Sequence, residues 1–389
     1  MANRTLLVII PDQLTAIINK GEITSRYYNP GELFDEVHIL MVNADQPDPA
    51  LIQPMVGRAK LFLHNLPIPP GRFFRKTLGW RPRLMRDWAA RGVDLANDIA
   101  PALIRCHGNH HNAYLASEIK RVLGVPYIIS MHINPDADVR RLTPWRGNFQ
   151  TRLLLSFHRL LERHNFRSCD CVVCVYDFIR PYAQSLGAKR IETIYNVINP
   201  EHLCPKVDYA LSDPPRLLLP GRQFEHKDPS PVIRALADIP NATLHLVGDG
   251  AYHEQLKELA IALRVENRCI FTKSLPNDEL CRTMRHYDVL LSVNGYGGVS
   301  KVDLEAAQVG MPVVTNAHFM ESLPEVLAEN CLVVDGSAKS YHTALTRLLS
   351  DEALRKQLGS KLRESVQCIT PERLETRVVE LYKQIMQRR

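Results

Sequence analysis

Short apolar runs alternate with longer amphipathic segments along almost the whole chain, and this alternation constrains the fold more than any other feature. The first apolar run begins at Thr5 and the last ends at Val334. Short, continuously apolar runs are typical of strands that are buried on both faces of a parallel sheet, with the amphipathic segments as the covering helices. The sequence therefore predicts an α/β fold.

The expected strands form two series with a proline-rich segment between them. The first series is Thr5–Ile10, Glu36–Val42, Lys60–Leu63, Ala102–Cys106, Pro126–Met131, Cys171–Val175 and Arg190–Ile194. The second series is Arg216–Leu219, Ala242–Val247, Cys269–Thr272, Val289–Val293, Pro312–Thr315 and Cys331–Val334. The segment from Asn199 to Pro215 carries several prolines and little periodicity, which indicates a linker.

Two doubly wound, Rossmann-like domains are therefore expected, 1–199 and 200–370. Ligands of such sheets bind at the carboxyl ends of the strands, and a cleft across which the two domains face each other is the expected site. After a Thr370 cap and a first-turn Pro371, residues 371–389 have the pattern of an amphipathic helix. We expect this helix to pack back on the first domain.

Composition agrees with a globular protein, since 45% of the 389 residues are hydrophobic and 23% are charged. The run Leu6–Ile10 is too short for the core of a signal peptide, and no stretch approaches the roughly 18–20 apolar residues of a membrane span. A cytoplasmic location is expected. The nine cysteines lack a disulfide-framework spacing and are expected to be free, buried thiols.

Two groups of residues invite interpretation as metal ligands, and we expect neither to bind a metal. The run CDCVVCV has the pattern of a strand, which places Cys174 on the opposite face from Cys169 and Cys171. The run CHGNHHN has no acidic residue nearby as a fourth ligand. Its polar side chains are more consistent with substrate contacts or with the start of a helix.

Two cations follow the expected strand Arg216–Leu219. The segment PGRQFEHKDP places Arg222 and Lys227 on the loop after the carboxyl end of that strand. Two cations beside a glycine that lets the backbone approach a ligand suit a diphosphate group. A solvated basic loop is the alternative interpretation of the same residues.

The next strands also end in segments that suit a nucleotide. Gly248 opens a sharp Gly-Asp-Gly turn, and the backbone around Thr272 is placed to meet the edge of a base. The expected helix Lys301–Val309 follows a loop with little side-chain bulk, whose members are Gly297, Gly298 and Val299. Its N-terminus at Ser300 and Lys301 favours an anion. Glu305, one turn inside the helix, can accept hydrogen bonds from a ribose diol.

In their order, these pieces resemble the retaining glycosyltransferases of family 4, group 1, which have the GT-B fold. The matching string is GR…HKDP…VIRAL…LHLVGDG…F…D…SK…LEA…G-PVV, and it covers essentially the whole second domain. The resemblance implies a nucleotide-diphosphate sugar as donor, no cofactor and no metal. It places Arg222 and Lys227 on the diphosphate-binding pair and Glu305 on the glutamate that binds the ribose.

One position departs from the family pattern. Family members carry a first glutamate eight positions before the second, lying against the donor sugar, and the corresponding residue here is Gly297. No carboxylate between Asn294 and Lys301 replaces it. The sugar contact is expected to be altered or to come from the backbone amides of Gly297 and Gly298. A catalytically impaired module that binds a nucleotide sugar as a sensor or scaffold stays open as an alternative.

The first domain resembles the family only in outline, as expected of an acceptor-binding domain. His132, at the end of GVPYIISMHI, falls on the family histidine that lies beside the reacting sugar. His107, Asn109 and His110 follow another strand, and we expect them to contact the acceptor. Gly21, in the long loop after the first strand, is expected to let the backbone approach the diphosphate.

A basic region with interleaved aromatic residues lies in the first domain. Its cations are Arg58, Lys60, Arg72, Arg75, Lys76, Arg81, Arg83, Arg86 and Arg91, and a second cluster runs from Arg140 to Arg167. Such a surface, here Arg72–Arg91, is typical of docking to anionic lipid headgroups. Nucleic acid is a weaker interpretation of a similar composition, and a solvated face is a third.

The sequence thus predicts a retaining glycosyltransferase that acts on a glycan or lipid-linked acceptor of the cell envelope, in the cytoplasm or at the inner face of the membrane. Its catalytic residues would be His132, Arg222 and Lys227. A nucleotide-sugar epimerase of the same fold is a second enzymatic alternative.

Overall fold

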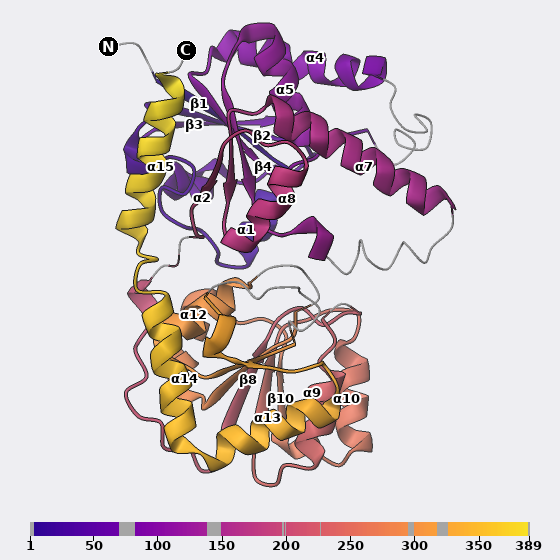
Figure 1. Ribbon diagram of the computed structural model, residues 1–389, viewed down its shortest axis with the longest axis vertical. Helices are drawn as coiled ribbons and strands as arrows, with labels where there is room; N and C mark the ends of the chain where they lie inside the picture. The colour runs from indigo at the N-terminus through magenta and orange to yellow at the C-terminus, as the bar shows by residue number, and fades with distance from the viewer. Residues whose placement is uncertain are drawn as a thin grey trace. The chain divides into compact units, whose positions relative to one another are not determined.

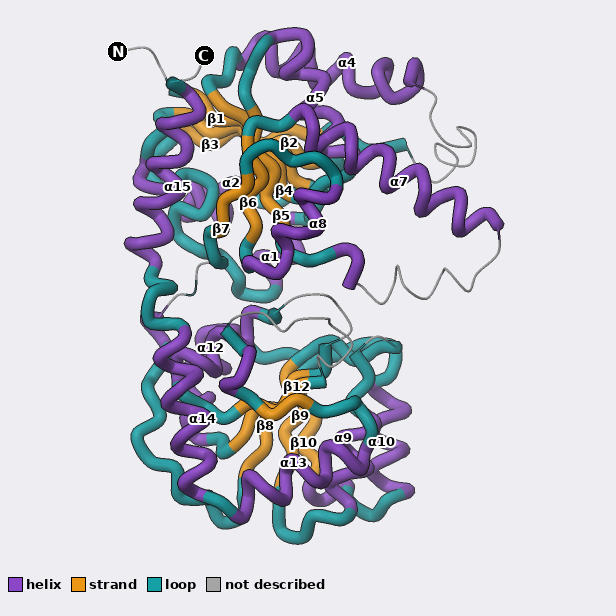
Figure 2. Tube along the Cα trace, viewed as in Figure 1, coloured by secondary structure: helices purple, strands orange, loops and turns teal. Residues whose placement is uncertain are grey.

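The computed structural model describes residues 4–69, 82–137, 149–196, 198, 200–225, 227–294, 299–316 and 326–387. Its contacts divide the chain into two compact units. Unit 1 comprises residues 1–134, 141–195 and 371–389, and unit 2 comprises residues 135–140 and 196–370. Each unit is a parallel sheet with helices packed against it (Figures 1 and 2).

Unit 1 contains a seven-stranded sheet in the order β3-β2-β1-β4-β5-β6-β7, with every pair parallel. The strands are β1 Thr5–Ile10, β2 Glu36–Met41, β3 Lys60–Asn65, β4 Leu103–His107, β5 Tyr127–Met131, β6 Cys171–Cys174 and β7 Ile191–Thr193. All residues of the central strands β1, β4 and β5 are buried, as continuous apolar runs require. The first series of predicted strands is confirmed.

The helices of unit 1 connect these strands. They are α1 Leu14–Asn19, α2 Pro49–Ile52, α4 Pro82–Ile99, α5 His111–Leu123, α7 Phe149–Ser168, α8 Arg180–Ser185 and the C-terminal α15 Pro371–Met386. A short 3-10 turn, η1 Pro30–Glu32, follows α1. Helix α5 ends at Gly124 in a left-handed conformation, the usual role of a glycine after a helix.

Unit 2 contains a six-stranded parallel sheet in the order β10-β9-β8-β11-β12-β13. The strands are β8 Arg216–Pro220, β9 Thr243–Val247, β10 Cys269–Thr272, β11 Val289–Ser292, β12 Val313–Thr315 and β13 Leu332–Val333. The helices are α9 Ser230–Ala237, α10 His253–Ala262, α11 Asn277–Thr283, α12 Lys301–Val309, α13 Ala338–Ser350 and α14 Glu352–Ser365. The second predicted series is confirmed, and so is the doubly wound α/β fold.

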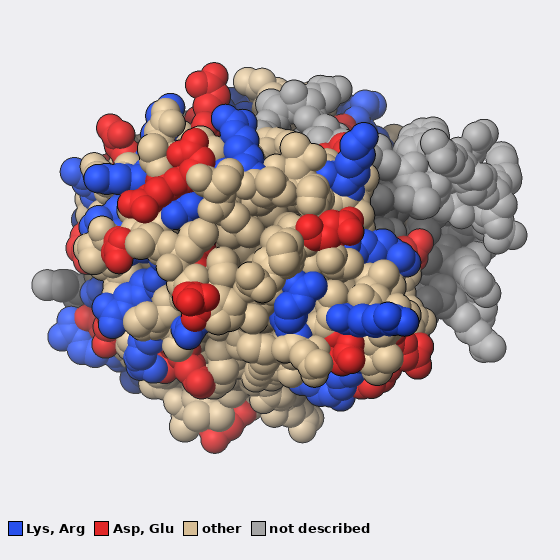
Figure 3. All heavy atoms as spheres, turned by 90° about the horizontal axis from the view of Figure 1, so that it is seen from below, with Lys and Arg blue, Asp and Glu red and all other residues tan. Residues whose placement is uncertain are grey.

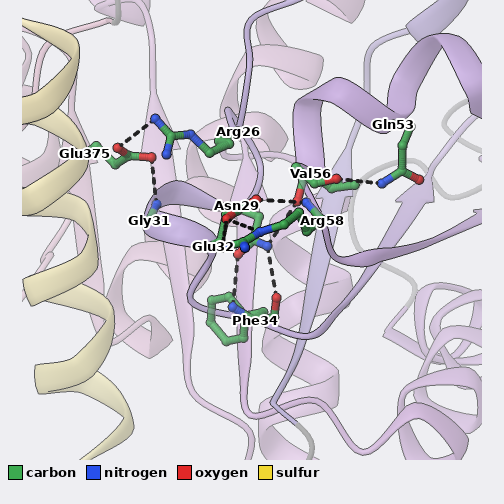
Figure 4. A network of polar contacts seen from close by, with 10 residues as sticks. Arg26, Asn29, Gly31, Glu32, Phe34, Gln53, Val56, Arg58 and Glu375 are labelled. Carbon is green, nitrogen blue, oxygen red and sulfur yellow. Dashed lines mark hydrogen bonds and ion pairs between the residues drawn. The ribbon is translucent and has the colours of Figure 1, made fainter.

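The C-terminal helix α15 packs on unit 1, although its sequence follows the last helix of unit 2. Glu375 accepts a hydrogen bond from the backbone N–H of Gly31 at 2.7 Å and pairs with Arg26 at 3.3 Å (Figure 4). One turn before the end of the helix, Tyr382 Oη accepts a hydrogen bond of 2.6 Å from Nη1 of the buried Arg105. The last helix therefore completes the core of the first unit.

The approach of α15 explains the glycine in η1. Gly31 has φ +62°, and a Cβ atom there would lie 2.7 Å from Cγ2 of Val379 on α15. Any other residue would be strained by the backbone conformation and would also push α15 away. Beside this turn, the side chain of Asn29 binds the backbone of Phe34 and Val56 (Figure 4).

Surface charge is mixed rather than concentrated on the face drawn in Figure 3, where Lys and Arg side chains are interspersed with Asp and Glu. Two cations of the predicted basic region pair with acids of the same unit, Arg58 with Glu32 and Lys60 with Glu36. Residues 70–81, which carry much of that region, lie outside the described residues. Among the described residues, no helix is long and apolar enough to cross a membrane.

Candidate functional site

The loop after β8 brings Arg222 and Lys227 together in unit 2. The backbone N–H of Lys227 donates to the carbonyl of Phe224 at 2.7 Å, and the Arg222 guanidinium lies 5.2 Å from the centre of the Phe224 ring. Burial lowers the pKa of Lys227 and the charge of Arg222 lowers it further, while Asp303 opposes both. A desolvated cation next to a second cation binds an anion favourably, because the anion offsets both the loss of hydration and the repulsion between the two cations.

The Gly-Asp-Gly turn after β9 holds this loop in place. Gly248 has φ +149°, and a Cβ there would lie 1.9 Å from the carbonyl oxygen of Gly221. The buried side chain of Gln223 donates to the carbonyl of Gly248 at 2.9 Å and contacts Nδ1 of His253 at 2.8 Å. The glycine predicted to contact the donor therefore sets the position of the Arg222 loop.

Helix α12 begins with a capping box made by Ser300 and Asp303. Ser300 Oγ accepts from the N–H of Asp303 at 3.2 Å, and Asp303 Oδ2 accepts from the N–H of Ser300 at 3.0 Å. The first-turn amides of Lys301 and Val302 have no acceptor inside the helix itself, so they are the ones suited to an anion. Val299 is buried before the cap. Gly297 and Gly298 lie outside the described residues.

Glu305 lies buried on α12 and has a partner that the sequence did not indicate. Nδ2 of Asn277, the first residue of α11, donates to both carboxylate oxygens of Glu305, at 3.1 and 3.3 Å. Lys301 Nζ donates to Oδ1 of the same asparagine at 3.1 Å and lies 3.7 Å from Glu305 Oε1. The carboxylate is therefore fixed by a neighbouring helix.

Thr272 is bound within unit 2 through both its side chain and its carbonyl. Its Oγ1 lies 2.7 Å from His245 Nε2, and its carbonyl accepts from the N–H of Gly248 at 2.8 Å. A base contact in this segment would therefore come from other backbone groups. That contact stays a prediction.

In unit 1, His107 and His132 stack at the carboxyl ends of β4 and β5. Their ring centres are 5.8 Å apart and the ring planes differ by 18°. Tyr27 and Tyr28, from the segment between α1 and η1, contact His107 at 5.6 and 5.5 Å between ring centres. Among the described residues, the buried Nε2 of His107 has no hydrogen-bond partner, so this histidine retains capacity for a ligand.

Asn109 and His110 follow His107 but have different surroundings. The carbonyl of Asn109 accepts from Asn165, and within the described part of the chain its buried Nδ2 has no hydrogen-bond partner. His110 Nε2 lies 3.0 Å from Oε1 of Glu162, a fully buried residue. The side-chain amide of Asn109 can thus still donate a hydrogen bond to a substrate, whereas the ring of His110 is oriented by Glu162.

Gly21 lies in the turn after α1, with φ +65°. Its N–H donates to the carbonyl of Ile18 at 2.9 Å, which closes the helix. The positive φ is a local structural reason for a glycine at this position. Its predicted approach to a diphosphate stays a prediction.

Among the described residues, no group of three or more His, Cys, Asp or Glu is suited to hold a metal ion, and the expectation that neither run binds a metal stays a prediction. Cys169, Cys171 and Cys174 are free and buried, as predicted, but the expectation of burial is wrong for Cys368, which is exposed, and for Cys204, which is partly exposed.

Buried histidines make stability depend on pH. Burial is the main cause that lowers the pKa of His38 to about 4, of His111 to about 3 and of His107 well below its ordinary value. Because the unfolded chain then takes up protons first, stability is lost as the pH falls below about 6.5. We expect protonation of His111 to lower the free energy of unfolding by about 1.4 kcal/mol at pH 5.5 relative to neutral pH, and that of His38 and His107 to act in the same direction.

Urea unfolding at pH 7.5 and 5.5 measures this loss. His107→Gln should reduce the difference between the two pH values, whereas His286→Gln, at an exposed position, should leave it unchanged. An equal pH dependence in the wild type and in His107→Gln would contradict the assignment of His107 as a buried neutral ring.

Comparisons with known proteins match both units. The protein-family model described as glycosyl transferases group 1 matches residues 206–365. The protein-family model described as Glycosyltransferase Family 4 matches residues 33–202. The lipopolysaccharide core biosynthesis glycosyltransferase LpsE of Rhizobium meliloti is 30% identical over 52% of this chain and 60% of its own length. The sulfoquinovosyl transferase SQD2 of Arabidopsis thaliana is 22% identical over 86% of this chain and 64% of its own length.

Solved structures share the fold. Sucrose-phosphate synthase from Thermosynechococcus elongatus superposes with a TM-score of 0.72 at 18% identity, over 99% of this chain and 100% of the other. HepE of Anabaena, solved in complex with UDP-glucose, has a TM-score of 0.69 at 15% identity, over 98% and 99%. A UDP-N-acetylglucosamine 2-epimerase from Listeria monocytogenes, so described provisionally, has a TM-score of 0.62 at 12% identity, over 100% and 98%.

The protein belongs to the group 1, family 4 glycosyltransferases and has the GT-B fold. The predicted family and fold are confirmed. The chain spans less than two thirds of the length of the first two relatives in these alignments.

Proposed function

We propose that this protein transfers a glycosyl unit, with retention of the anomeric configuration, from a nucleotide-diphosphate sugar to a glycan or lipid-linked acceptor of the cell envelope. The observation that carries the proposal is the loop after β8, on which Arg222 and the part-buried Lys227 lie close enough for their charges to interact. Glu305, buried on α12 of the same unit, supplies the acid for a ribose diol.

In this proposal, residues of unit 2 bind the donor, and residues of unit 1 contact the reacting sugar and the acceptor. In unit 2, Arg222 and Lys227 hold the diphosphate with the first-turn amides after Ser300, and Glu305 holds the ribose. In unit 1, His132 lies beside the reacting sugar, and His107, Asn109 and His110 bind the acceptor. For Gly297 and Gly298, which lie outside the described residues, a backbone contact with the donor sugar in place of the family's first glutamate stays a prediction.

Charge stabilisation is the catalytic principle of this proposal. The bond between the anomeric carbon and the diphosphate oxygen breaks while the acceptor oxygen forms a new bond to the same carbon. The acceptor proton passes to the leaving phosphate oxygen, so no separate general base is needed. Arg222 and Lys227 stabilise the charge that develops on the diphosphate, the role that a metal takes elsewhere.

The names of related proteins support the substrate classes that we propose. HepE was solved with UDP and with UDP-glucose. LpsE is named for lipopolysaccharide core biosynthesis, and a Mycolicibacterium smegmatis relative, 27% identical over 63% of this chain, is named a GDP-mannose-dependent mannosyltransferase acting on a phosphatidylinositol mannoside. These names favour a nucleotide-diphosphate sugar as donor and a glycan or lipid-linked acceptor.

A screen of nucleotides followed by a transfer assay tests the proposal. Thermal shifts with UDP, GDP and ADP identify the base, since a ligand that binds the folded state raises the melting temperature. Radiolabelled UDP-glucose or GDP-mannose with a cell-envelope extract should then give a labelled glycan, and NMR gives its anomeric configuration. Binding without transfer favours the sensor alternative, and conversion of the donor sugar without acceptor favours an epimerase.

Docking to an anionic membrane surface is part of the same proposal. On α7, Arg163 and Arg167 line a hollow of about 530 Å³ together with Leu160, His164 and Ser168, and Leu160 is 55% exposed. Basic side chains around an exposed apolar one suit a lipid headgroup region. Sedimentation with phosphatidylglycerol vesicles should show binding that weakens with salt, and no salt-sensitive binding would exclude this part of the proposal.

A further inference from the structure

The partner of Glu305 comes from a different segment of unit 2. Asn277 opens α11, after the loop that follows β10, whereas Glu305 lies inside α12. The amide nitrogen of Asn277 contacts both carboxylate oxygens, at 3.1 and 3.3 Å. Glu305 is 1% exposed, while Asn277 and Lys301 are partly exposed. The three side chains thus form a cluster whose buried member is the acid.

The geometry of Lys301 shows what the asparagine does to the charge pair. The ammonium nitrogen is closer to Asn277 Oδ1, at 3.1 Å, than to Glu305 Oε1, at 3.7 Å. Asn277 therefore accepts from the cation and donates to the anion, and it lies between them. A buried carboxylate held by an amide donor keeps one orientation, and its oxygens can each accept more than one hydrogen bond.

We propose that Asn277 is a positioning residue that sets the preference of this site for ribose over 2′-deoxyribose nucleotides. The inference rests on the proposed function, in which Glu305 accepts hydrogen bonds from the ribose hydroxyls. A hydroxyl gains most from a charged acceptor when that acceptor is fixed in advance. Without Asn277, Glu305 can turn toward Lys301 and shorten their 3.7 Å ion pair, and the ribose then loses its acceptor.

Selectivity between UDP and 2′-deoxy-UDP measures this role directly. The wild type should bind UDP about tenfold more tightly than 2′-deoxy-UDP, the factor expected for one hydrogen bond to a charged acceptor. In Asn277→Ala that preference should fall to roughly twofold or less, mainly through weaker binding of UDP. Isothermal titration gives both affinities, and GDP with 2′-deoxy-GDP replaces the pair if the wild type prefers guanine.

Two further variants separate positioning from a general structural role. Asn267→Ala makes the same substitution at an exposed position between α10 and β10, and its selectivity should equal that of the wild type. Asn277→Asp replaces the amide donor with a carboxylate beside Glu305. Relative to the wild type at the same pH, its UDP affinity should be lowest at pH 8 and recover toward pH 5.5, because one shared proton restores a donor between the two acids.

The outcomes are distinct. Unchanged selectivity or tighter UDP binding in Asn277→Ala overturns the inference, and so does a wild type that binds UDP and 2′-deoxy-UDP equally. An equal loss of affinity for both nucleotides also overturns it, since that would be a purely structural effect. A wild type that binds none of these nucleotides contradicts the proposed function itself.

Discussion

Replacement of Lys227 by alanine is expected to lower turnover at least 100-fold, and Arg222→Ala should have an effect of the same order. Removal of one group that stabilises developing charge costs about 100- to 1,000-fold in turnover. Lys227 is already desolvated in the folded protein, since burial lowers its pKa. Its charge therefore acts on the diphosphate with little screening by water. Initial rates with radiolabelled donor and envelope extract measure the loss.

Lys339→Ala is the matched control, because Lys339 is exposed in the first turn of α13. Its turnover should equal that of the wild type. Near-normal turnover in both Lys227→Ala and Arg222→Ala would remove the chemical basis of the proposed function. Retained nucleotide binding with lost turnover would instead agree with a role in the transition state.

Gly248→Ala is expected to have the second large effect, by displacing the loop that carries Arg222. The new Cβ would lie 1.9 Å from the carbonyl oxygen of Gly221 and 2.8 Å from its carbonyl carbon, and neither atom belongs to a flexible side chain. Overpacking together with backbone strain should cost unit 2 about 2–6 kcal/mol of its free energy of unfolding. Nucleotide binding should weaken along with it. Urea unfolding and UDP titration measure the two effects.

Gly124→Ala provides a control for the loss of a positive-φ glycine without a clash. Gly124 has φ +71° at the end of α5, and nothing lies within 4 Å of the position of a new Cβ. This variant should lose about 1 kcal/mol and bind UDP normally. If Gly248→Ala were as stable as Gly124→Ala and bound UDP normally, the close approach of the two loops would not matter for the site.

Local patterns were sufficient to predict the sheets. The strand Thr5–Ile10 has the predicted bounds, because a strand buried on both faces leaves a continuous apolar run in the sequence. The edge strand Cys269–Thr272, which is only partly buried, also has the predicted bounds. The loop with Arg222 and Lys227 was also predictable, since the chemistry follows directly on a strand end. A feature can be predicted from the order of residues along the chain when one segment contains all of its residues.

Contacts between distant segments could not be predicted in this way. Asn277 meets Glu305 across 28 positions, and Tyr382 meets Arg105 across 277. Gln223, which holds the Arg222 loop, is a single buried amide without any periodic signal. Each of these residues is common in surface loops or helices, and only the packing of separate elements gives it a role.

The position of α15 has a consequence for the order in which the newly made protein can fold. Residues 371–387 leave the ribosome after residues 4–370, yet they supply buried side chains to unit 1, including Leu374, Leu381 and Tyr382. Residues 196–370 can therefore form their own core before α15 has been made and can pack on unit 1. During that interval Phe34 and Arg105, both buried in the finished protein, are not covered by Tyr382. The nascent chain then exposes the apolar surface that chaperones recognise, and premature termination would harm the half that was made first.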